Sequence, residues 1–201
     1  MFFYGTSIKD PKVDRLLDLA RLILEPDYAR KTHITLRGPY SRKPKRNVKW
    51  LTTEIGPVTF TKPGCFFNER QNTVYLRAEI SGIAEIWSKP DYPEGVPHLS
   101  LYDGEDRTFA WALFSLLKEF SWQIQLALTN ISIIEKKKNL VTSYILDEEV
   151  LKFGLEVIGA KQYTMEQIRD MHDGQRLHLV HLICNKIHLS SLTDYQSEIA
   201  F

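Results

Sequence analysis

Two short segments, HITL at residues 33–36 and HLSL at residues 98–101, place the strongest constraint on how this chain can fold. Each contains a histidine, an apolar residue, a hydroxyl residue and a second apolar residue. Successive side chains of an extended strand point to opposite faces of a sheet. Each segment therefore predicts a strand that carries an imidazole and a hydroxyl on one face and two apolar side chains on the other. Two such strands facing across a cleft would gather these polar groups around one small anion.

The residue types on the polar faces predict chemistry at a phosphodiester. Imidazole exchanges a proton near neutral pH, so one of His33 and His98 could take a proton from an attacking hydroxyl or water. The other could protonate the departing oxygen, and the order of the two roles stays open. Thr35 and Ser100 could donate hydrogen bonds to the phosphoryl oxygens as charge develops there. This design requires neither a metal nor a cofactor.

Three further residues are candidates for substrate binding. Arg37 is in phase with the first motif and could hold a phosphate through two parallel hydrogen bonds, or it could simply be a solvated strand end. Tyr102 is in phase with the second motif and could stack on a base or bind a phosphate oxygen; alternatively, it bridges core and solvent. Tyr4, on a predicted edge strand, is a weaker candidate for base stacking.

The paired motifs resemble those of the two-histidine (2H) phosphoesterases, the RNA ligase/cyclic phosphodiesterase superfamily. Each member carries two H-x-[ST]-x elements, and the separation here, 98 − 33 = 65 positions, looks typical of the family. The resemblance implies a bilobal α+β fold, in which two antiparallel sheets face a central cleft and helices lie on the outside. It also implies substrates such as RNA 2′,3′-cyclic phosphates, 2′,5′-linked oligoadenylates and cyclic oligonucleotide signals of antiviral immunity. Phage and viral members degrade the last two.

We therefore expect a cytoplasmic phosphodiesterase of the 2H type, either a hydrolase or a cyclising phosphotransferase. It would cleave 2′,5′-linked or cyclic oligonucleotides, and so serve immune evasion, without a metal. One alternative is an RNA-end 2′,3′-cyclic phosphodiesterase of RNA processing or repair. Alternatives of another class are a non-catalytic nucleotide-binding module and an interaction protein that acts through its helical end.

The order of predicted elements divides the chain into a two-lobed core at residues 1–146 and a helical C-terminal extension at 147–201. Apolar residues recur at helical spacing over 11–24 and 106–119, so one helix is expected to back each lobe. Besides the motif segments, alternating or β-rich stretches predict strands at 2–8, 50–54, 58–62, 73–79 and 122–128. In the extension, helices are predicted at 148–157 and 173–189, with a capping box that begins another at Thr164.

The charge balance favours a small partner, and the cysteine count favours a reducing compartment. The net charge is +1, which argues against a protein that coats duplex DNA and fits a small nucleotide or a short RNA better. A basic run at residues 41–49 could attract such a polyanion or be an ordinary solvated loop. Two cysteines make no disulfide framework, and neither a secretory signal nor a membrane-spanning run is expected. The oligomeric state stays open.

A second group of candidate ligands lies near the C-terminus. The group comprises His178, His181, Cys184 and His188, all within one predicted helix. Residues strung along one helix span several turns, so a single ion could reach only neighbouring pairs. We therefore expect a polar helix face here rather than a zinc site.

Overall fold

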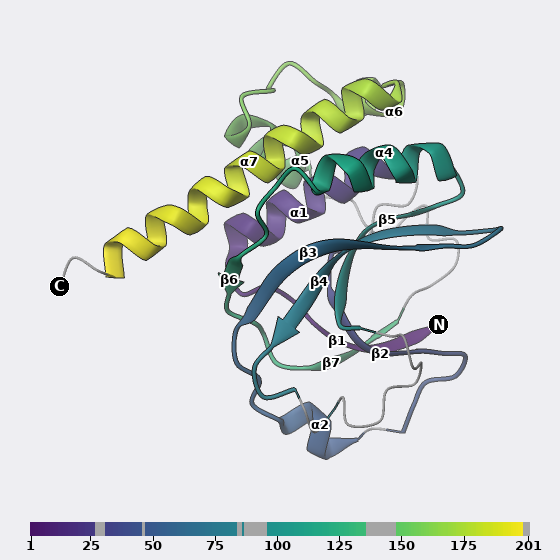
Figure 1. Cartoon of the computed structure of the whole chain (residues 1–201), viewed down its shortest axis with the longest axis vertical. Coiled ribbons are helices and arrows are strands. Elements are labelled where there is room, and N and C mark those ends of the chain that lie inside the picture. The colour runs from purple at the N-terminus through teal and green to yellow at the C-terminus, as the bar shows by residue number, and fades with distance from the viewer. Residues whose placement is uncertain (27–30, 46, 84–85, 87–95, 136–147, 199–201) are drawn as a thin grey trace.

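The computed structural model describes residues 1–26, 31–45, 47–83, 86, 96–135 and 148–198. Within these residues, all seven strands form one antiparallel sheet in the order β6-β3-β4-β5-β2-β1-β7, and the sheet curls (Figure 1). The strands are β1 (Phe2–Thr6), β2 (Ile34–Tyr40), β3 (Val58–Phe67), β4 (Asn72–Ile80), β5 (His98–Gly104), β6 (Ile124–Leu126) and β7 (Ser132–Glu135). The helices are α1 (Pro11–Leu24), α2 (Val48–Thr52), α4 (Arg107–Leu117), α5 (Glu148–Val157), α6 (Met165–Arg169) and α7 (Asp173–Glu198).

The α+β class is as predicted, but the described strands form one sheet where two separate sheets were expected. The reason is the pairing of β2 with β5, the two strands that carry the histidine motifs. Their hydrogen bonds join β1, β2 and β7 to the half built from β3, β4, β5 and β6. The motif strands therefore lie side by side at the middle of the sheet, and their polar side chains project from a shared surface.

Helix α1 is more deeply buried than its predicted amphipathic pattern implies. Asp10 caps its N-terminus by accepting hydrogen bonds from the backbone N–H groups of Lys12 and Val13, and Pro11 occupies the first helical position, as the sequence predicts. From Leu16 to Leu24 every side chain is buried, including the polar ones. The helix packs against β5 on one side and against α5 and α7 on the other. A helix buried all round belongs to the interior of a domain, and α1 is the central helix here.

The C-terminal helices share the core of the rest of the chain. Gly154 of α5 lies so close to Leu19 of α1 that an added Cβ would lie only 2.5 Å from the Cδ2 atom of the leucine. Thr164 and Gln167 form the predicted capping box of α6. The predicted division between residues 1–146 and 147–201 falls on residues outside the described part. No helix in the described part of the chain is long and apolar enough to cross a bilayer.

The strand predicted at residues 50–54 is wrong, because most of that stretch belongs to helix α2. The side chain of Asn47 accepts a hydrogen bond from the backbone N–H of Trp50 and begins the helix. Asparagine is a strong N-cap residue, and its local hydrogen bond outweighs the strand preference of the residues that follow.

Candidate active site

The register between β2 and β5 brings the four predicted catalytic residues onto one face of the sheet. Thr35 lies directly opposite His98. One further step in the same register places His33 opposite Ser100. Residues directly opposite one another in an antiparallel pair share a face and have Cβ atoms about 5 Å apart. We call this surface, defined by His33, Thr35, His98 and Ser100, the histidine face.

The other face of the same two strands belongs to the hydrophobic core. The apolar motif residues that alternate with the polar ones are at most 1% exposed, and they are Ile34, Leu36, Leu99 and Leu101. The polar motif residues are all partly exposed. The two-residue alternation read from the sequence therefore holds across residues 33–36 and 98–101, and a one-residue slip of either strand would bury an imidazole.

Each motif imidazole faces the backbone carbonyl oxygen two residues before it. Nδ1 of His98 lies 2.6 Å from the oxygen of Val96, and Nδ1 of His33 lies 3.4 Å from the oxygen of Lys31. A carbonyl oxygen only accepts, so Nδ1 is the nitrogen that donates in both rings. In the neutral ring the basic lone pair is then on Nε2. Both imidazoles are thus oriented by a hydrogen bond to the carbonyl oxygen two residues earlier. This hydrogen bond is long for His33 and short for His98.

Burial lowers the pKa of His98 below its ordinary value, which favours the neutral ring at neutral pH. The hydrogen bond to Val96 and the negative charge of Asp103 act in the opposite direction and are smaller. The Asp103 carboxylate is itself held, because it accepts hydrogen bonds from the Thr73 hydroxyl at 2.6 Å and from the Gln71 side-chain amide. The Asp103 carboxylate that raises the pKa of His98 is therefore held in place by hydrogen bonds.

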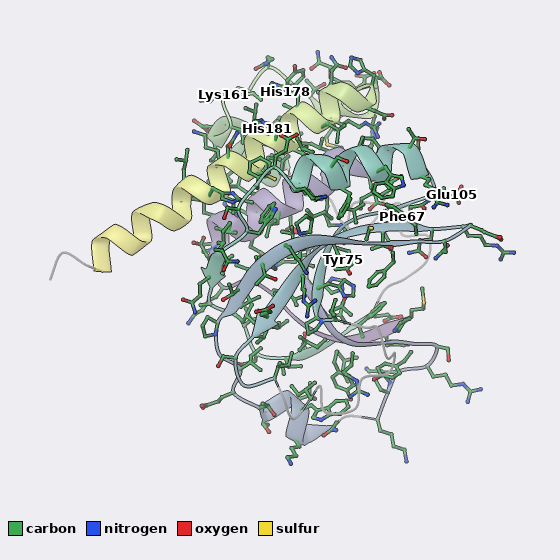
Figure 2. The ribbon with its side chains drawn as sticks, in the orientation of Figure 1. Phe67, Tyr75, Glu105, Lys161, His178 and His181 are labelled. Carbon is green, nitrogen blue, oxygen red and sulfur yellow. The ribbon has the colours of Figure 1, made fainter. Side chains whose placement is uncertain are left out.

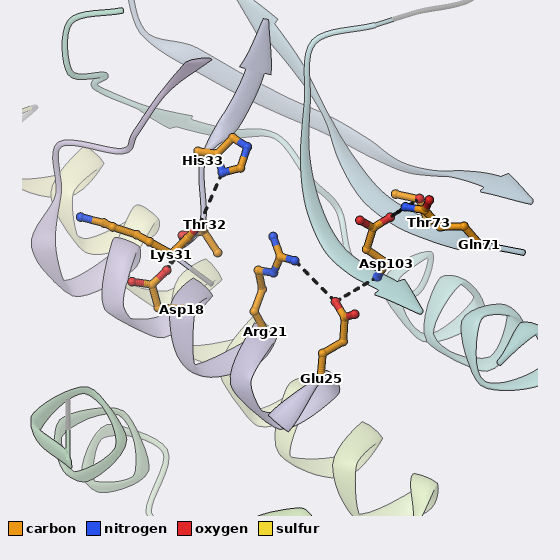
Figure 3. Close-up of polar contacts among 9 residues, drawn as sticks. All are labelled: Asp18, Arg21, Glu25, Lys31, Thr32, His33, Gln71, Thr73 and Asp103. Atoms are coloured by element: carbon orange, nitrogen blue, oxygen red, sulfur yellow. Dashed lines mark hydrogen bonds and ion pairs between the residues drawn. The ribbon is translucent and has the colours of Figure 1, made fainter. Parts of the chain in front are cut away.

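A buried carboxylate of α1 anchors the chain just before His33. Asp18 accepts two hydrogen bonds from Thr32, one from the backbone N–H at 2.6 Å and one from the hydroxyl at 2.7 Å (Figure 3). Burial raises the pKa of Asp18 to about 6 from its ordinary 3.8, although both hydrogen bonds lower it. Lys31, the preceding residue, forms an ion pair of 3.3 Å with Asp14 of the same helix. The first motif strand thus starts from a segment fixed to α1.

A second carboxylate, on the residue that caps the C-terminus of α1, holds the far end of β5. Oε2 of Glu25 accepts a hydrogen bond of 3.0 Å from the backbone N–H of Asp103 and lies 3.5 Å from the Arg21 guanidinium (Figure 3). The side chains of Arg21 and Glu25 are both buried. Helix α1 is therefore tied to both motif strands by carboxylates, which fixes the position of one strand relative to the other.

Aromatic side chains surround the imidazoles, and the sequence did not single them out. Tyr75 of β4 lies opposite Ser100, and its ring centroid is 5.0 Å from that of His98. Phe66 of β3 stacks on Tyr75 at 4.6 Å with an interplanar angle of 24°, and Phe66 is 38% exposed. On the other side of the face, the ring of Phe3 is 6.1 Å from that of His33.

The assignment of these rings to the histidine face depends on the β3–β4–β5 register, which no local sequence signal specifies. Gly64 pairs with Tyr75, and an added Cβ there would overlap the tyrosine ring, so the ring lies flat over the glycine. Figure 2 shows Tyr75 on the side of the strands away from α4, whereas Phe67 points to the side of α4. Phe67 accordingly contacts Trp111 of α4, with ring centroids 5.0 Å apart.

The structure does not bring Tyr102 to the histidine face. The pairing of β4 with β5 shifts by one residue between Val74 and Tyr75, so Tyr102 lies opposite the buried Val74. Tyr102 is 5% exposed, its ring contacts Phe109 of α4, and its hydroxyl accepts a hydrogen bond from the backbone N–H of Asp106. The alternation predicted for this strand fails at Tyr102, because such a register shift reverses the facing of the residues beyond it.

Tyr4 and Arg37 contact residues of the segments around the sheet. Tyr4 is 2% exposed; its hydroxyl donates to the carbonyl oxygen of Lys45 at 2.9 Å and accepts from the N–H of Asn47 at 3.3 Å. Arg37 donates to the carbonyl oxygen of Ile86 at 2.8 Å, and its guanidinium lies 4.9 Å from the centroid of the Trp50 ring. These contacts give both residues a part in holding the segments around the sheet.

The histidines of α7 have a different environment. Among the described residues, no three or more His, Cys, Asp or Glu side chains are grouped so that they could hold a metal ion. His188 has Nε2 at 2.9 Å from the carbonyl oxygen of Ser121 and Nδ1 at 2.9 Å from that of Cys184. Its ring packs against Phe120 and Trp122, so it joins α7 to the segment after α4.

Comparison with known proteins assigns no relative to the chain. No family model matches it, and neither a curated protein nor a solved structure does so.

Proposed function

We propose that the chain is a metal-independent phosphodiesterase of the two-histidine type. Its substrates would be 2′,5′-linked or cyclic oligonucleotides, the nucleotide messengers of antiviral immunity. The observation that carries the proposal is the register of β2 and β5, in which Thr35 lies opposite His98 and His33 continues opposite Ser100. Two imidazoles and two hydroxyls on neighbouring strands are the groups that in-line cleavage of a phosphodiester needs.

His98 is the better candidate for the general base. Its lowered pKa keeps the ring neutral at neutral pH, and its Nδ1–H donates to Val96, so Nε2 can accept a proton from the attacking hydroxyl or water. His33 would then protonate the departing oxygen. The hydroxyls of Thr35 and Ser100 would donate to the non-bridging oxygens, where negative charge develops in the transition state.

The aromatic rings beside His98 support a nucleotide as the substrate. Phe66 is partly exposed and stacked on Tyr75, and exposed aromatic rings next to a phosphate site provide a surface on which a base can stack. Such stacking is worth about 1–3 kcal/mol per base and tolerates any base. In this proposal, the two lobes expected of a 2H phosphoesterase correspond to the two halves of one curled sheet, which meet at the motif strands.

A substrate panel tests the proposal. It contains a cyclic dinucleotide, a cyclic trinucleotide, a 2′,5′-oligoadenylate and an RNA that ends in a 2′,3′-cyclic phosphate, with the products resolved by mass. We expect cleavage of the first three kinds in the presence of EDTA. Preference for the RNA end would instead favour the repair activity. Tight binding without turnover would identify a nucleotide-binding module, and loss of turnover in EDTA would contradict the metal-independent mechanism.

A further inference from the structure

A row of side chains crosses the sheet on the histidine face and extends beyond the predicted catalytic residues. Arg77 of β4 lies directly opposite His98, and Lys62 of β3 lies directly opposite Arg77. Direct partners share a face, so the row runs Lys62, Arg77, His98, Thr35. Two cations therefore stand beside the imidazole, one strand and two strands away from it.

The spacing of this row suits a nucleotide chain. Neighbouring strands lie about 4.8 Å apart, so the two cations start about 5 Å and about 10 Å from His98 across the sheet. Successive phosphates of an oligonucleotide are separated by a single sugar, which is a step of this size. Phosphates are the groups that a guanidinium grips with two parallel hydrogen bonds and that a lysine attracts as a point charge.

The side chain of Arg77 is accessible and only weakly engaged by its neighbour. It is 41% exposed, and its Nε lies 4.0 Å from Oε1 of Glu79, whose own side chain is 61% exposed. An exposed ion pair at this distance contributes little. The charge of Arg77 also reaches the Tyr75 hydroxyl, where it acts to lower the pKa against the larger effect of burial. A phosphate could therefore replace Glu79 as the partner of the guanidinium.

We propose that Arg77 and Lys62 bind a second phosphate of the substrate, next to the phosphate held between the two histidines. The inference rests on the proposed function and deepens it by naming the substrate class. The preferred substrate carries at least two phosphates, as 2′,5′-linked oligonucleotides with a terminal phosphate and cyclic oligonucleotides do. A dinucleoside monophosphate and a mononucleotide 2′,3′-cyclic phosphate lack the group that these side chains recognise.

Two substrates that differ by one phosphate provide the test. One is a 2′,5′-linked dinucleoside monophosphate, and the other is the same compound with an additional 5′-phosphate. We expect the protein to cleave the second compound with a kcat/KM at least about tenfold higher. Arg77→Gln should remove most of this preference by raising KM for the two-phosphate compound. The kcat/KM for the one-phosphate compound should stay within about twofold of the wild-type value. The salt dependence of binding should fall by an amount that corresponds to about one phosphate contact.

Two variants of matched size give the controls. Glu79→Gln removes a competing negative charge beside Arg77, so it should lower KM for the two-phosphate compound, opposite in sign to Arg77→Gln. Lys186→Gln removes a positive charge from an exposed position on α7 and should leave kcat/KM unchanged for both compounds. Equal kcat/KM values for the two compounds in the wild-type protein would overturn the inference. An equal loss on both compounds in Arg77→Gln would overturn it too, because Arg77 would then act on the scissile phosphate.

Failure of this inference is distinguishable from failure of the proposed function. Binding of the phosphorothioate-linked forms of both compounds is measured by calorimetry alongside the kinetics. If neither natural compound is cleaved, the phosphodiesterase proposal fails, while tighter binding of the two-phosphate form would still support the Arg77 and Lys62 site. If cleavage occurs and the two forms bind equally, the second-phosphate site fails and the phosphodiesterase proposal stands.

Discussion

Histidines lie both on the sheet and on helix α7, and they form different hydrogen bonds in the two places. On the sheet, the imidazoles of His33 and His98 each donate from Nδ1 to a nearby backbone carbonyl oxygen, and hydroxyl residues stand opposite them. On α7, both nitrogens of His188 lie 2.9 Å from carbonyl oxygens, and its ring packs on aromatic side chains. The first arrangement suits proton exchange with a ligand, and the second suits joining two parts of the protein.

The comparison shows that histidines from two conspicuous sequence patterns can have different surroundings in the fold. His178, His181 and His188 recur along α7 at intervals that a helix spreads over several turns, and Figure 2 labels the first two of them. The sheet histidines are far apart in sequence but are brought to neighbouring strands. On α7, by contrast, both ring nitrogens of His188 lie next to backbone carbonyl oxygens.

Replacing the sheet histidines is expected to have the largest effect. His33→Ala and His98→Ala should each lower kcat by about 10²- to 10⁴-fold, because each removes one proton transfer. Both side chains lie on the partly exposed face, so thermal unfolding should stay close to that of the wild-type protein. His178→Ala, at an exposed position on α7, is the matched control and should retain activity. A similar loss of kcat in all three variants would contradict a special role for the sheet histidines.

The carboxylate that anchors the segment before His33 should make stability depend on pH. The pKa of Asp18 is raised to about 6 in the folded protein from 3.8, so the folded state binds more protons between these values. The free energy of unfolding therefore falls as pH rises from about 4 to about 6, by at most about 3 kcal/mol from this group. Asp18→Asn should abolish this fall, since an amide oxygen still accepts from Thr32 and carries no charge.

Urea denaturation of the wild-type protein and of Asp18→Asn across this pH range measures the difference. Asp18→Leu serves as the contrast, because it leaves the backbone N–H and the hydroxyl of Thr32 without their acceptor, and it should be destabilised at every pH. Parallel pH profiles for the wild-type protein and Asp18→Asn would contradict the raised pKa.

Removing the structural histidine of α7 should affect stability and leave chemistry intact. His188→Ala loses the hydrogen bond to Ser121 and the packing on Trp122, so we expect a loss of about 1–3 kcal/mol in the free energy of unfolding. The kcat of the folded protein should not change. Lys186→Ala, two residues away and exposed, is the control for stability. A His188→Ala protein that is inactive but as stable as the wild type would contradict a structural role for this histidine.

The smallest expected effect concerns the charge near His98. Asp103 raises the pKa of His98 against the larger effect of burial, so Asp103→Asn should lower that pKa further. The acidic limb of the kcat/KM profile should then move to lower pH, by less than about one unit. The same shift should be visible in an NMR titration of the His98 ring. An unchanged titration would show that the carboxylate does not act on this imidazole.

Local signals in the sequence predict a substantial part of the fold. The alternation in the two motifs places His33, Thr35, His98 and Ser100 on one side of their strands, and Asp10 and Thr164 mark helix starts through the hydrogen bonds of their side chains. These features depend on neighbours within a few residues, which the sequence shows directly.

Features that depend on pairing between distant segments could not be predicted in this way. The adjacency of β2 and β5 joins residues 63 positions apart, 98 − 35, and no local pattern encodes it. The same holds for Arg77, Tyr75 and Phe66, which reach the histidine face only through the register of β3, β4 and β5. The buried position of Tyr102 follows from a one-residue shift in that register.

The split of roles between the two imidazoles is the central claim, and a change of leaving group tests it most directly. A nucleoside p-nitrophenyl phosphodiester releases an anion that needs no proton, so loss of the general acid costs little with this substrate. We predict that His33→Ala recovers most of the wild-type kcat/KM on this compound, whereas His98→Ala stays impaired. Equal impairment of both variants on this compound, or full activity of both on the natural substrate, would contradict an acid–base pair acting across one phosphate.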